Sequence, residues 1–234
     1  MTNIENKIAY ITGGTKGIGF GIARALLENG IKIAISGRNM KDVEKAKQAL
    51  GNQNVLALQA DVRDFDDEVK AVEQIVATYG KLDIVIANAG LGKFAPVDEL
   101  TLEDWNAMID TNLTGVFHTL KATVNQLKQT KGYYISIASL AGTNFFAQAA
   151  GYNASKFGVV GFTQAAMLDL RNYGIKCTTI MPGSVTSHFN EHIPNDADEW
   201  KIQPSDLGQI VVDLLKMNSN VLPSKIEVRP TKTK

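Results

Sequence analysis

The sequence predicts an α/β fold built on one doubly wound parallel sheet of seven strands with helices on both faces. Short apolar runs alternate with helical patterns along the chain, and a glycine-rich turn joins the first strand to the first helix. The chain has 234 residues, 44% of them hydrophobic, which is enough for one large core. Because strand–helix–strand crossovers are right-handed, this alternation specifies parallel strands. We therefore expect a single domain over residues 1–234.

The elements follow one another in a regular order. Strands are expected at residues 8–12, 32–36, 55–59, 83–87, 133–137, 176–181 and 225–228. Helices are expected at residues 17–29, 41–50, 64–79, 101–129, 152–173 and 204–217. The one long irregular stretch, residues 188–203, is expected to form a substrate loop, because loops at the carboxyl edge of such a sheet build the binding pocket.

The glycine-rich turn lies where an anion site is expected. Gly13 permits the tight turn, Gly17 lets backbone amides approach a pyrophosphate, and Gly19 allows the helix to lie close to the strand. The helix N-terminus then attracts the anion. The spacing differs from G-x-G-x-x-G, and a glycine cluster alone also suits a plain structural turn. The strand before it and the helix after it nevertheless favour a nucleotide-binding Rossmann fold.

Tyr152 and Lys156 form a candidate acid/base pair, since residues four apart share one face of a helix. An unperturbed tyrosine titrates at about pH 10. We therefore expect the ammonium of Lys156 to lower the pKa of the Tyr152 phenol toward neutrality. A surface Tyr and Lys on an ordinary helix have the same spacing. Ser139, at the end of an apolar strand-like run upstream, favours the catalytic interpretation.

With these residues in order, the chain resembles the short-chain dehydrogenase/reductase family over essentially its whole length. The resemblance implies that Tyr152 exchanges a proton with a carbonyl or alcohol and that Ser139 hydrogen-bonds the substrate oxygen. It also implies that Lys156 lowers the pKa of Tyr152 and holds the nicotinamide ribose, and that Asn112 anchors a water of the proton relay. The matching stretches are residues 12–19, 61–62, 88–90, 111–113, 139, 152 with 156, and 182–183.

The resemblance further implies where a nicotinamide cofactor lies. The glycine turn would hold the pyrophosphate, the pair after the third strand the adenine ring, and the segment after the fourth strand the adenosine ribose. At the far end, either Thr186 or Ser187 would hold the nicotinamide carboxamide, because Ser187 stands where the family often has threonine. The implied cofactor residues are Gly13, Thr15, Lys16, Gly17, Ile18, Gly19, Arg38, Asp61, Val62, Asn88, Ala89, Gly90, Tyr152, Lys156, Pro182, Gly183, Val185 and Ser187.

The end of the second strand predicts NADP(H) as the cofactor. An NAD-preferring site places a carboxylate there for the ribose 2′-hydroxyl, whereas this chain has Ser36, Gly37 and Arg38. The planar fork of Arg38 suits a 2′-phosphate, and Lys16 adds a second positive charge. A solvated turn arginine and a surface lysine are the structural alternative. No metal site is predicted.

Charge and composition indicate the kind of partner. Lys plus Arg and Asp plus Glu number 24 each, so no overall basic field attracts nucleic acid or an anionic membrane. No hydrophobic signal region or bilayer-long apolar stretch is present. We expect a cytoplasmic protein that acts on a small-molecule carbonyl or alcohol. Small residues at positions 154, 158, 161 and 165 of one helix, together with the resemblance, predict a homodimer or homotetramer.

The substrate is predicted only by class. Two apolar walls are expected, one from Phe145, Phe146, Ala147 and Ala149, the other from His188, Phe189 and Ile193. The body of the chain is similar to 3-oxoacyl-carrier-protein reductases, whereas its C-terminal end is more similar to enzymes that oxidise 3-hydroxy acids. The alternatives are a general ketone or aldehyde reductase and a non-catalytic NADP sensor, which would not need the complete proton-transfer set.

Overall fold

The seven predicted strands are present and form one parallel sheet. The computed structural model describes residues 2–51, 53–187 and 189–232. The strand order is β3-β2-β1-β4-β5-β6-β7, which confirms the predicted fold class. The bounds are β1 (Ile8–Thr12), β2 (Lys32–Gly37), β3 (Val55–Gln59), β4 (Ile84–Ala87), β5 (Tyr133–Ile137), β6 (Lys176–Pro182) and β7 (Lys225–Val228).

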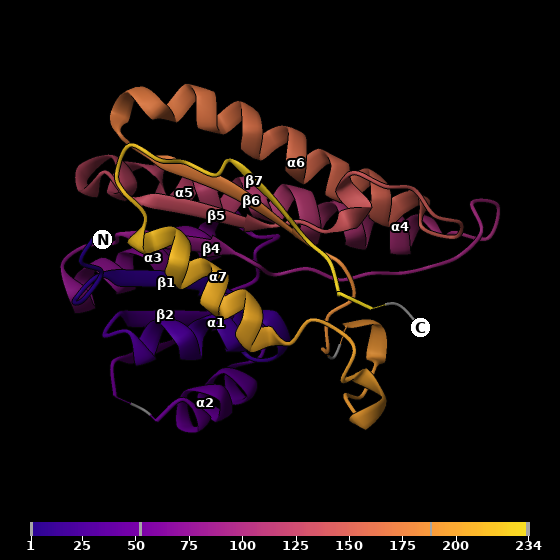
Figure 1. Cartoon of the computed structure of the whole chain (residues 1–234), viewed down its shortest axis with the longest axis horizontal. Helices are drawn as coiled ribbons and strands as arrows, with labels where there is room; N and C mark the ends of the chain where they lie inside the picture. Colours follow the sequence, from indigo (N-terminus) through magenta and orange to yellow (C-terminus); the bar gives the residue numbers. More distant parts are fainter. Residues whose placement is uncertain (1, 52, 188, 233–234) are drawn as a thin grey trace.

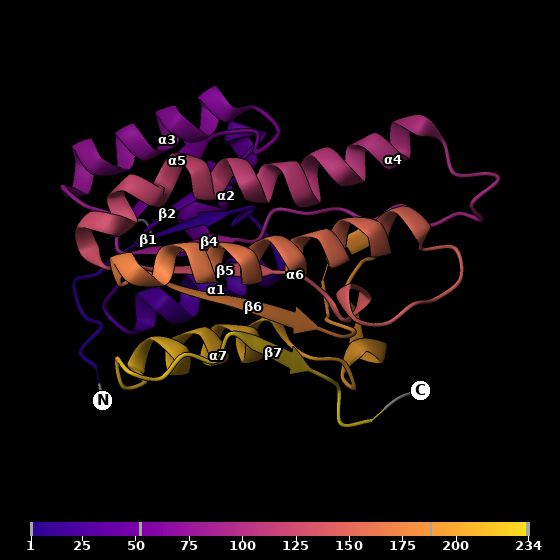
Figure 2. The same cartoon turned by 90° about the horizontal axis from the view of Figure 1, so that it is seen from above.

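Helices cover both faces of the sheet (Figures 1 and 2). Side chains alternate along β1, so Ala9 and Ile11 pack on one face while Ile8 and Tyr10 pack on the other. The first face is covered by α1 (Gly17–Glu28), α2 (Met40–Ala49) and α7 (Pro204–Lys216), the second by α3 (Phe65–Tyr79), α5 (Gly115–Thr130) and α6 (Ala150–Leu170). Strand β1 is therefore buried on both sides, as a central strand of a doubly wound sheet must be.

Local chemistry sets where several helices begin and end. The Asp64 carboxylate accepts from the Asp66 backbone N–H at 2.9 Å and caps α3, which ends at Gly80 with φ of 80°. Thr101 caps α4 (Leu102–Ile109) in the same way by accepting from the backbone N–H of Asp104. Pro204 begins α7, where a missing N–H costs nothing.

One predicted helix is interrupted. Residues 101–129 were expected to form a single helix, but a π-helical turn, Asp110–Thr114, separates α4 from α5. The wider turn includes Asn112, whose side chain is completely buried and hydrogen-bonded outside the helix. Turns of this kind are frequent at functional sites. The sequence pattern could not reveal it, because apolar periodicity continues across the turn.

The strand order reverses between β1 and β4. Helices leave these two strands toward opposite faces, which opens a crevice at their carboxyl ends. All the loops that carry predicted site residues leave the sheet at this edge. The fold thus brings together segments from the first strand to the sixth.

A buried carboxyl group lies beneath this region. The Glu68 side chain of α3 is fully buried and accepts a hydrogen bond from the Tyr10 hydroxyl at 2.8 Å, while its second oxygen has no partner among the described residues. Burial raises the pKa of Glu68 from its ordinary value of 4.5 to about 7. Between pH 4.5 and about 7, the folded protein keeps the proton that the unfolded chain has already lost.

We expect the unfolding free energy to fall as pH rises from 5 to 8, because the folded state must give up the Glu68 proton against burial. The pKa difference corresponds to about 3 kcal/mol. The substitution Glu68→Gln should remove this part of the pH dependence, measured by urea unfolding at both pH values. Glu73→Gln, at an exposed position of the same helix, is the control and should keep it. Equal pH dependence in all three proteins would show that Glu68 does not titrate in this range.

Candidate active site

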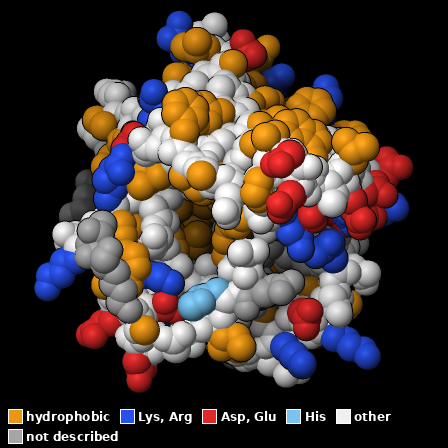
Figure 3. Space-filling view, turned by 90° about the vertical axis from the view of Figure 1, so that its right-hand side faces the viewer, with side chains coloured by type: hydrophobic (Ala, Val, Ile, Leu, Met, Phe, Trp, Pro, Cys, Tyr) orange, Lys and Arg blue, Asp and Glu red, His pale blue; other side chains and the backbone are white. Residues whose placement is uncertain are grey.

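A cavity of about 280 Å³ opens at the carboxyl edge of the sheet. Figure 3 looks onto this edge and shows a central hollow bordered by hydrophobic side chains. Fourteen of the predicted cofactor residues line the cavity: Gly13, Thr15, Lys16, Gly17, Ile18, Arg38, Asp61, Val62, Asn88, Ala89, Gly90, Tyr152, Lys156 and Ser187. The predicted residues Gly19, Asn112, Ser139, Pro182, Gly183 and Val185 lie outside the set that lines it.

The glycine turn is shaped by close backbone approach. Gly13 and Gly17 have φ of 64° and 57°, which side-chain-bearing residues rarely adopt. A Cβ at Gly13 would lie 2.9 Å from Ala89 Cα, and one at Gly19 would lie 2.5 Å from Asn88 Nδ2. Glycine at position 19 therefore allows α1 to pack closely against the loop after β4.

Hydrogen bonds tie this turn to the loop after β4. The Asn88 Nδ2 donates to the carbonyls of Thr12 and Gly13 at 2.9 and 3.1 Å. In return, the Thr12 hydroxyl accepts from the backbone N–H groups of Asn88 and Ala89, both at 3.1 Å. The two sides of the crevice are thereby fixed relative to each other.

Cationic side chains gather on the β2–β3 side of the cavity. Arg38 and Lys16 are both exposed there, and neither makes an ion pair with a described residue. Asp61 lies nearby, and Arg63 forks onto its carboxylate with a shortest distance of 2.6 Å. The hydrogen bonds from Arg63 lower the pKa of Asp61, and the charge of Arg38 adds to that effect.

The acid/base pair lies on α6, on the β5 side of the cavity. Tyr152 and Lys156 are 8% and 4% exposed, so their polar groups are nearly removed from bulk water. The Lys156 Nζ donates to the Ile137 carbonyl at 3.0 Å and lies 5.8 Å from the centroid of the Tyr152 ring. The predicted pairing on one helix face is therefore present.

The charge states of this pair differ from the sequence-based prediction. Burial raises the pKa of Tyr152 to about 12, against a smaller lowering by a hydrogen bond with Ser139. Burial also lowers the pKa of Lys156 to about 8, because a cation loses its hydration there. The prediction of a Tyr152 pKa near neutrality is wrong for this structure, since burial raises that pKa.

Hydrogen bonds fix the side chains of Ser139 and Asn112 near Tyr152 and Lys156. The Ser139 Oγ accepts from the Ala141 backbone N–H at 3.1 Å and begins a short 3-10 turn, η2 (Leu140–Gly142). The Asn112 side chain makes two 2.8 Å hydrogen bonds to the backbone of Leu91 and donates to the Ser155 hydroxyl at 3.0 Å. Ser155 in turn donates to the Tyr152 carbonyl.

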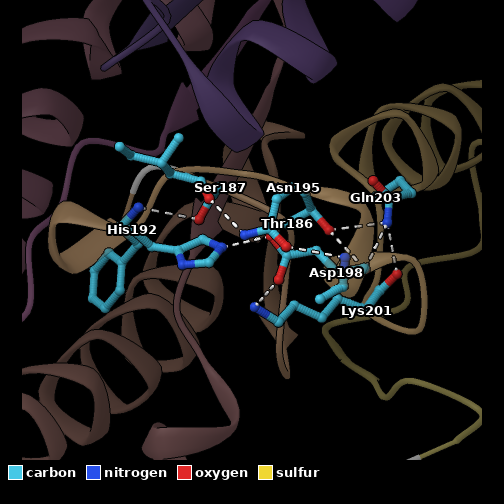
Figure 4. A network of polar contacts seen from close by, with 10 residues as sticks. Thr186, Ser187, His192, Asn195, Asp198, Lys201 and Gln203 are labelled. Atoms are coloured by element: carbon cyan, nitrogen blue, oxygen red, sulfur yellow. Dashed lines mark hydrogen bonds and ion pairs between the residues drawn. The ribbon is translucent and has the colours of Figure 1, made fainter.

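The segment after β6 closes the cavity. Gly183 packs against Leu140, and Val185 pairs with Ile202 in an isolated bridge. The Thr186 hydroxyl donates to the Asp198 carbonyl at 3.1 Å and accepts from Gln203 Nε2 at 3.0 Å (Figure 4). Pro182, the last residue of β6, is buried.

Ser187 is arranged differently from its neighbour. Its side chain lines the cavity, and its Oγ accepts a long hydrogen bond from the Phe189 backbone N–H at 3.4 Å. The hydroxyl proton of Ser187 therefore stays available to an acceptor in the cavity, whereas that of Thr186 is already used within the loop (Figure 4).

A buried carboxylate organises the predicted substrate loop (Figure 4). Asp198 is 4% exposed and contacts His192 Nε2 and Lys201 Nζ, each at 2.5 Å. The hydrogen bond with His192, followed by that with Lys201, holds the pKa of Asp198 well below its ordinary value. This role could not be predicted from the sequence, since aspartate is common in exposed loops.

The predicted substrate walls are only partly assembled. Phe189 lines the cavity and contacts Phe94, which was not predicted from the sequence, and Phe94 in turn contacts Phe146. Phe145 is 82% exposed and stacks on Phe157, and Ile193 is 77% exposed, so the prediction is wrong for these two. His188 lies outside the described residues.

Other cavity residues were missed because they carry no distinctive side chain. All but Thr111, which lies in the π-helical turn, are at the carboxyl end of a strand or shortly after it, where the predicted strand ends could have identified them. The missed residues are Ser36, Gly37, Ala60, Leu91, Thr111, Ile137 and Ala138.

Two further findings concern the described part of the chain. No group of three or more His, Cys, Asp or Glu side chains within residues 2–51, 53–187 and 189–232 is placed to hold a metal ion. In those same ranges, no helix combines the length and the apolar character needed to span a membrane.

Comparison with known proteins identifies the family. The model of the short chain dehydrogenase family matches residues 7–198. An uncharacterized oxidoreductase of Staphylococcus aureus strain MW2 is 32% identical over 231 residues, covering 98% of this chain and 100% of the relative.

Solved structures agree with the sequence match. An alcohol dehydrogenase from the archaeon Thermococcus sibiricus, complexed with 5-hydroxy-NADP, has a TM-score of 0.91 and 29% identity, covering 97% of this chain and 98% of that one. A metagenomic short-chain oxidoreductase in complex with NADP has a TM-score of 0.85 and 27% identity, covering 99% of this chain and 100% of that one. The chain belongs to the short-chain dehydrogenase family of oxidoreductases.

Proposed function

We propose that the protein is an NADP(H)-dependent oxidoreductase that interconverts a carbonyl compound and a secondary alcohol, with Tyr152 as proton donor and acceptor. The observation that carries the proposal is one cavity with Arg38 and Lys16 on its β2–β3 side and Tyr152 with Lys156 on its β5 side. NADP and 5-hydroxy-NADP in the two similar structures support the choice of cofactor.

The residues present fit a dinucleotide phosphate. Helix α1 begins without an acidic residue in its first turn and without a side-chain cap, so its N–H groups are open to a pyrophosphate. Among the described residues, only Ser187 lies near the position of a Cβ at Gly17, at 3.3 Å. Arg38 and Lys16 offer positive charge to a 2′-phosphate. When bound, the reduced cofactor supplies a hydride.

Tyr152 supplies the proton in the proposed reduction. A pKa of about 12 keeps the phenol protonated at neutral pH, so it can donate to a carbonyl oxygen that becomes an alkoxide. Ser139 would donate a hydrogen bond to the same oxygen. Lys156, charged below a pKa of about 8, stabilises the tyrosinate that remains and is placed to hold the ribose.

Asn112 is a positioning residue in this proposal. Its three hydrogen bonds fix the backbone at Leu91 and, through Ser155, the carbonyl of Tyr152. The water relay at Asn112 that the family resemblance implies stays a prediction. The complete set of Asn112, Ser139, Tyr152 and Lys156 supports an enzyme over an NADP sensor.

The natural substrate has two candidate classes. A 3-oxoacyl or 3-hydroxy acid compound stays a prediction from the sequence, and a general ketone or aldehyde is the alternative. The aromatic side chains around Tyr152 favour the alternative, because the two neighbouring rings of Phe94 and Phe189 suit an uncharged substrate.

The assembly and location are proposed from the sequence. Ala154, Gly161 and Ala165 lie exposed on one face of α6, and no described atom lies within 4 Å of the position of a Cβ at Gly161. This surface supports a homodimer or homotetramer, in which another helix could approach closely. Gly158 packs instead against Leu113 of the same chain. A cytoplasmic location stays a prediction.

The substitution Tyr152→Phe should reduce carbonyl turnover at least about 100-fold, because the ring remains while the transferable proton is lost. The dissociation constant for NADPH, measured by fluorescence titration, should change little. Tyr173→Phe, at a half-exposed position away from the cavity, should keep full turnover. Undiminished turnover of Tyr152→Phe would falsify the assigned proton donor.

Arg38→Ala should weaken NADPH binding about 10-fold or more while leaving NADH binding nearly unchanged, since only NADPH carries the 2′-phosphate. Titration calorimetry with both cofactors measures the difference. Arg24→Ala, at an exposed position of α1, is the matched control. Equal losses for the two cofactors would assign Arg38 a structural role.

Ser187→Ala should raise the KM for NADPH more than Thr186→Val raises it, because only the Ser187 hydroxyl proton is free to donate into the cavity. Thr186→Val should instead lower the melting temperature, since it removes the hydrogen bond to Asp198. Steady-state kinetics and thermal unfolding of both variants test the assignment. The reverse pattern would place the nicotinamide carboxamide at Thr186.

A further inference from the structure

Two phenylalanine rings flank Tyr152, the proposed proton donor, and a third packs against one of them. The Phe94 and Phe189 rings lie 5.5 and 5.4 Å from the Tyr152 ring, centroid to centroid, in edge-on and tilted orientations. Phe94 also contacts Phe189 at 6.3 Å and Phe146 at 6.2 Å. We call Phe94, Phe146 and Phe189 the aromatic rim. The rim and the phenol form one continuous aromatic cluster.

The rim is assembled from three separate loops. Phe94 follows β4, Phe146 precedes α6, and Phe189 follows β6, so only the fold brings them together. The Ala95 backbone N–H donates to the Gln148 carbonyl at 2.9 Å and ties the first loop to the second. These connections hold the Phe94 and Phe146 rings at a defined separation.

The backbone beneath the rim is also adapted to it. A Cβ at Gly92 would lie 2.4 Å from Phe189 Cζ and 3.1 Å from Phe94 Cε2. Glycine at this position therefore lets both rings lie directly on the backbone after β4. Phe94 and Phe146 remain 36% and 50% exposed. Their free faces are consequently available to a bound molecule at the mouth of the site.

Tyr152 packs within a hydrophobic cluster beside the rim. The residues that pack with Tyr152 are Met108, Ala141, Ala149, Leu91, Leu100 and Phe189. The Lys156 ammonium lies 5.8 Å from the centroid of the Tyr152 ring and is hydrogen-bonded to the Ile137 carbonyl. A carboxylate held against these rings would lose hydration without a matching partner. The chemistry therefore favours an uncharged substrate.

We propose that the aromatic rim makes this enzyme selective for a carbonyl compound with a flat aromatic ring attached next to the carbonyl carbon. The inference rests on the proposed function, because Tyr152 delivers its proton inside the cluster. A substrate ring makes edge-to-face and offset contacts with the rim in addition to burying area. A flexible alkyl chain of equal size gains only the area and loses more rotational freedom.

The test compares phenyl methyl ketone, a straight-chain methyl ketone with the same number of carbons, and the free 3-oxo acid acetoacetate. For the wild-type protein with saturating NADPH, kcat/KM should be at least about 10-fold higher for the phenyl ketone than for the other two. Equal or higher values for the straight-chain ketone or for acetoacetate would overturn the proposed selectivity.

Variants assign the preference to the rim. Phe94→Leu and Phe146→Leu should each lower kcat/KM for the phenyl ketone about fivefold and change it little for the straight-chain ketone. Phe145→Leu is the matched control, because Phe145 stacks on Phe157 at 5.0 Å instead of facing the cluster. Equal losses for both ketones in the rim variants would show that the rim is structural only.

A binding measurement separates this inference from the proposed function. In Tyr152→Phe with NADP⁺, saturation-transfer NMR should show contacts to the ring protons of 1-phenylethanol that weaken in the double variant with Phe94→Leu. Undiminished turnover by Tyr152→Phe would contradict the proposed function. Contacts unaffected by Phe94→Leu would contradict the aromatic rim while leaving the proposed function in place.

Discussion

The hydrogen bonds between Asn88 and the first glycine turn fix the site on which the other features depend. In a doubly wound sheet the crevice opens where the strand order reverses, here between β1 and β4. Without a connection, the two loops that border it would be free to separate. Asn88 and Thr12 exchange four hydrogen bonds across this boundary, counting those to Gly13 and Ala89. The glycine turn, where we propose that the pyrophosphate binds, and the loop after β4 are therefore held together as one unit.

Burial governs the chemistry at the β5 side of the cavity. It raises the pKa of Tyr152 and lowers that of Lys156, so both groups are driven toward their uncharged forms. A protonated phenol is the form that reduction requires. The π-helical turn contributes by placing the Asn112 side chain where it holds the backbone near both residues. Helix irregularity and the acid/base pair are thus parts of one arrangement.

The substrate side is organised by loops instead of by the sheet. Asp198 gathers His192 and Lys201 and accepts from Thr186, so the segment after β6 is held as a unit over the cavity. That leaves Ser187 and Phe189 facing the site. The same loop therefore supports both the proposed nicotinamide contact and the aromatic rim.

The sequence by itself determined the sheet, its parallel strands and most of the cavity lining, because glycine turns and strand ends fall at fixed positions in such a fold. Tyr152 and Lys156 were also determined, since four residues on a helix bring two side chains together. Only the tertiary structure decided the π-helical turn, the role of Asp198 and the place of Phe94. It also reversed the predicted pKa shift of Tyr152. These features depend on contacts between distant segments and on burial, and neither is encoded in local spacing.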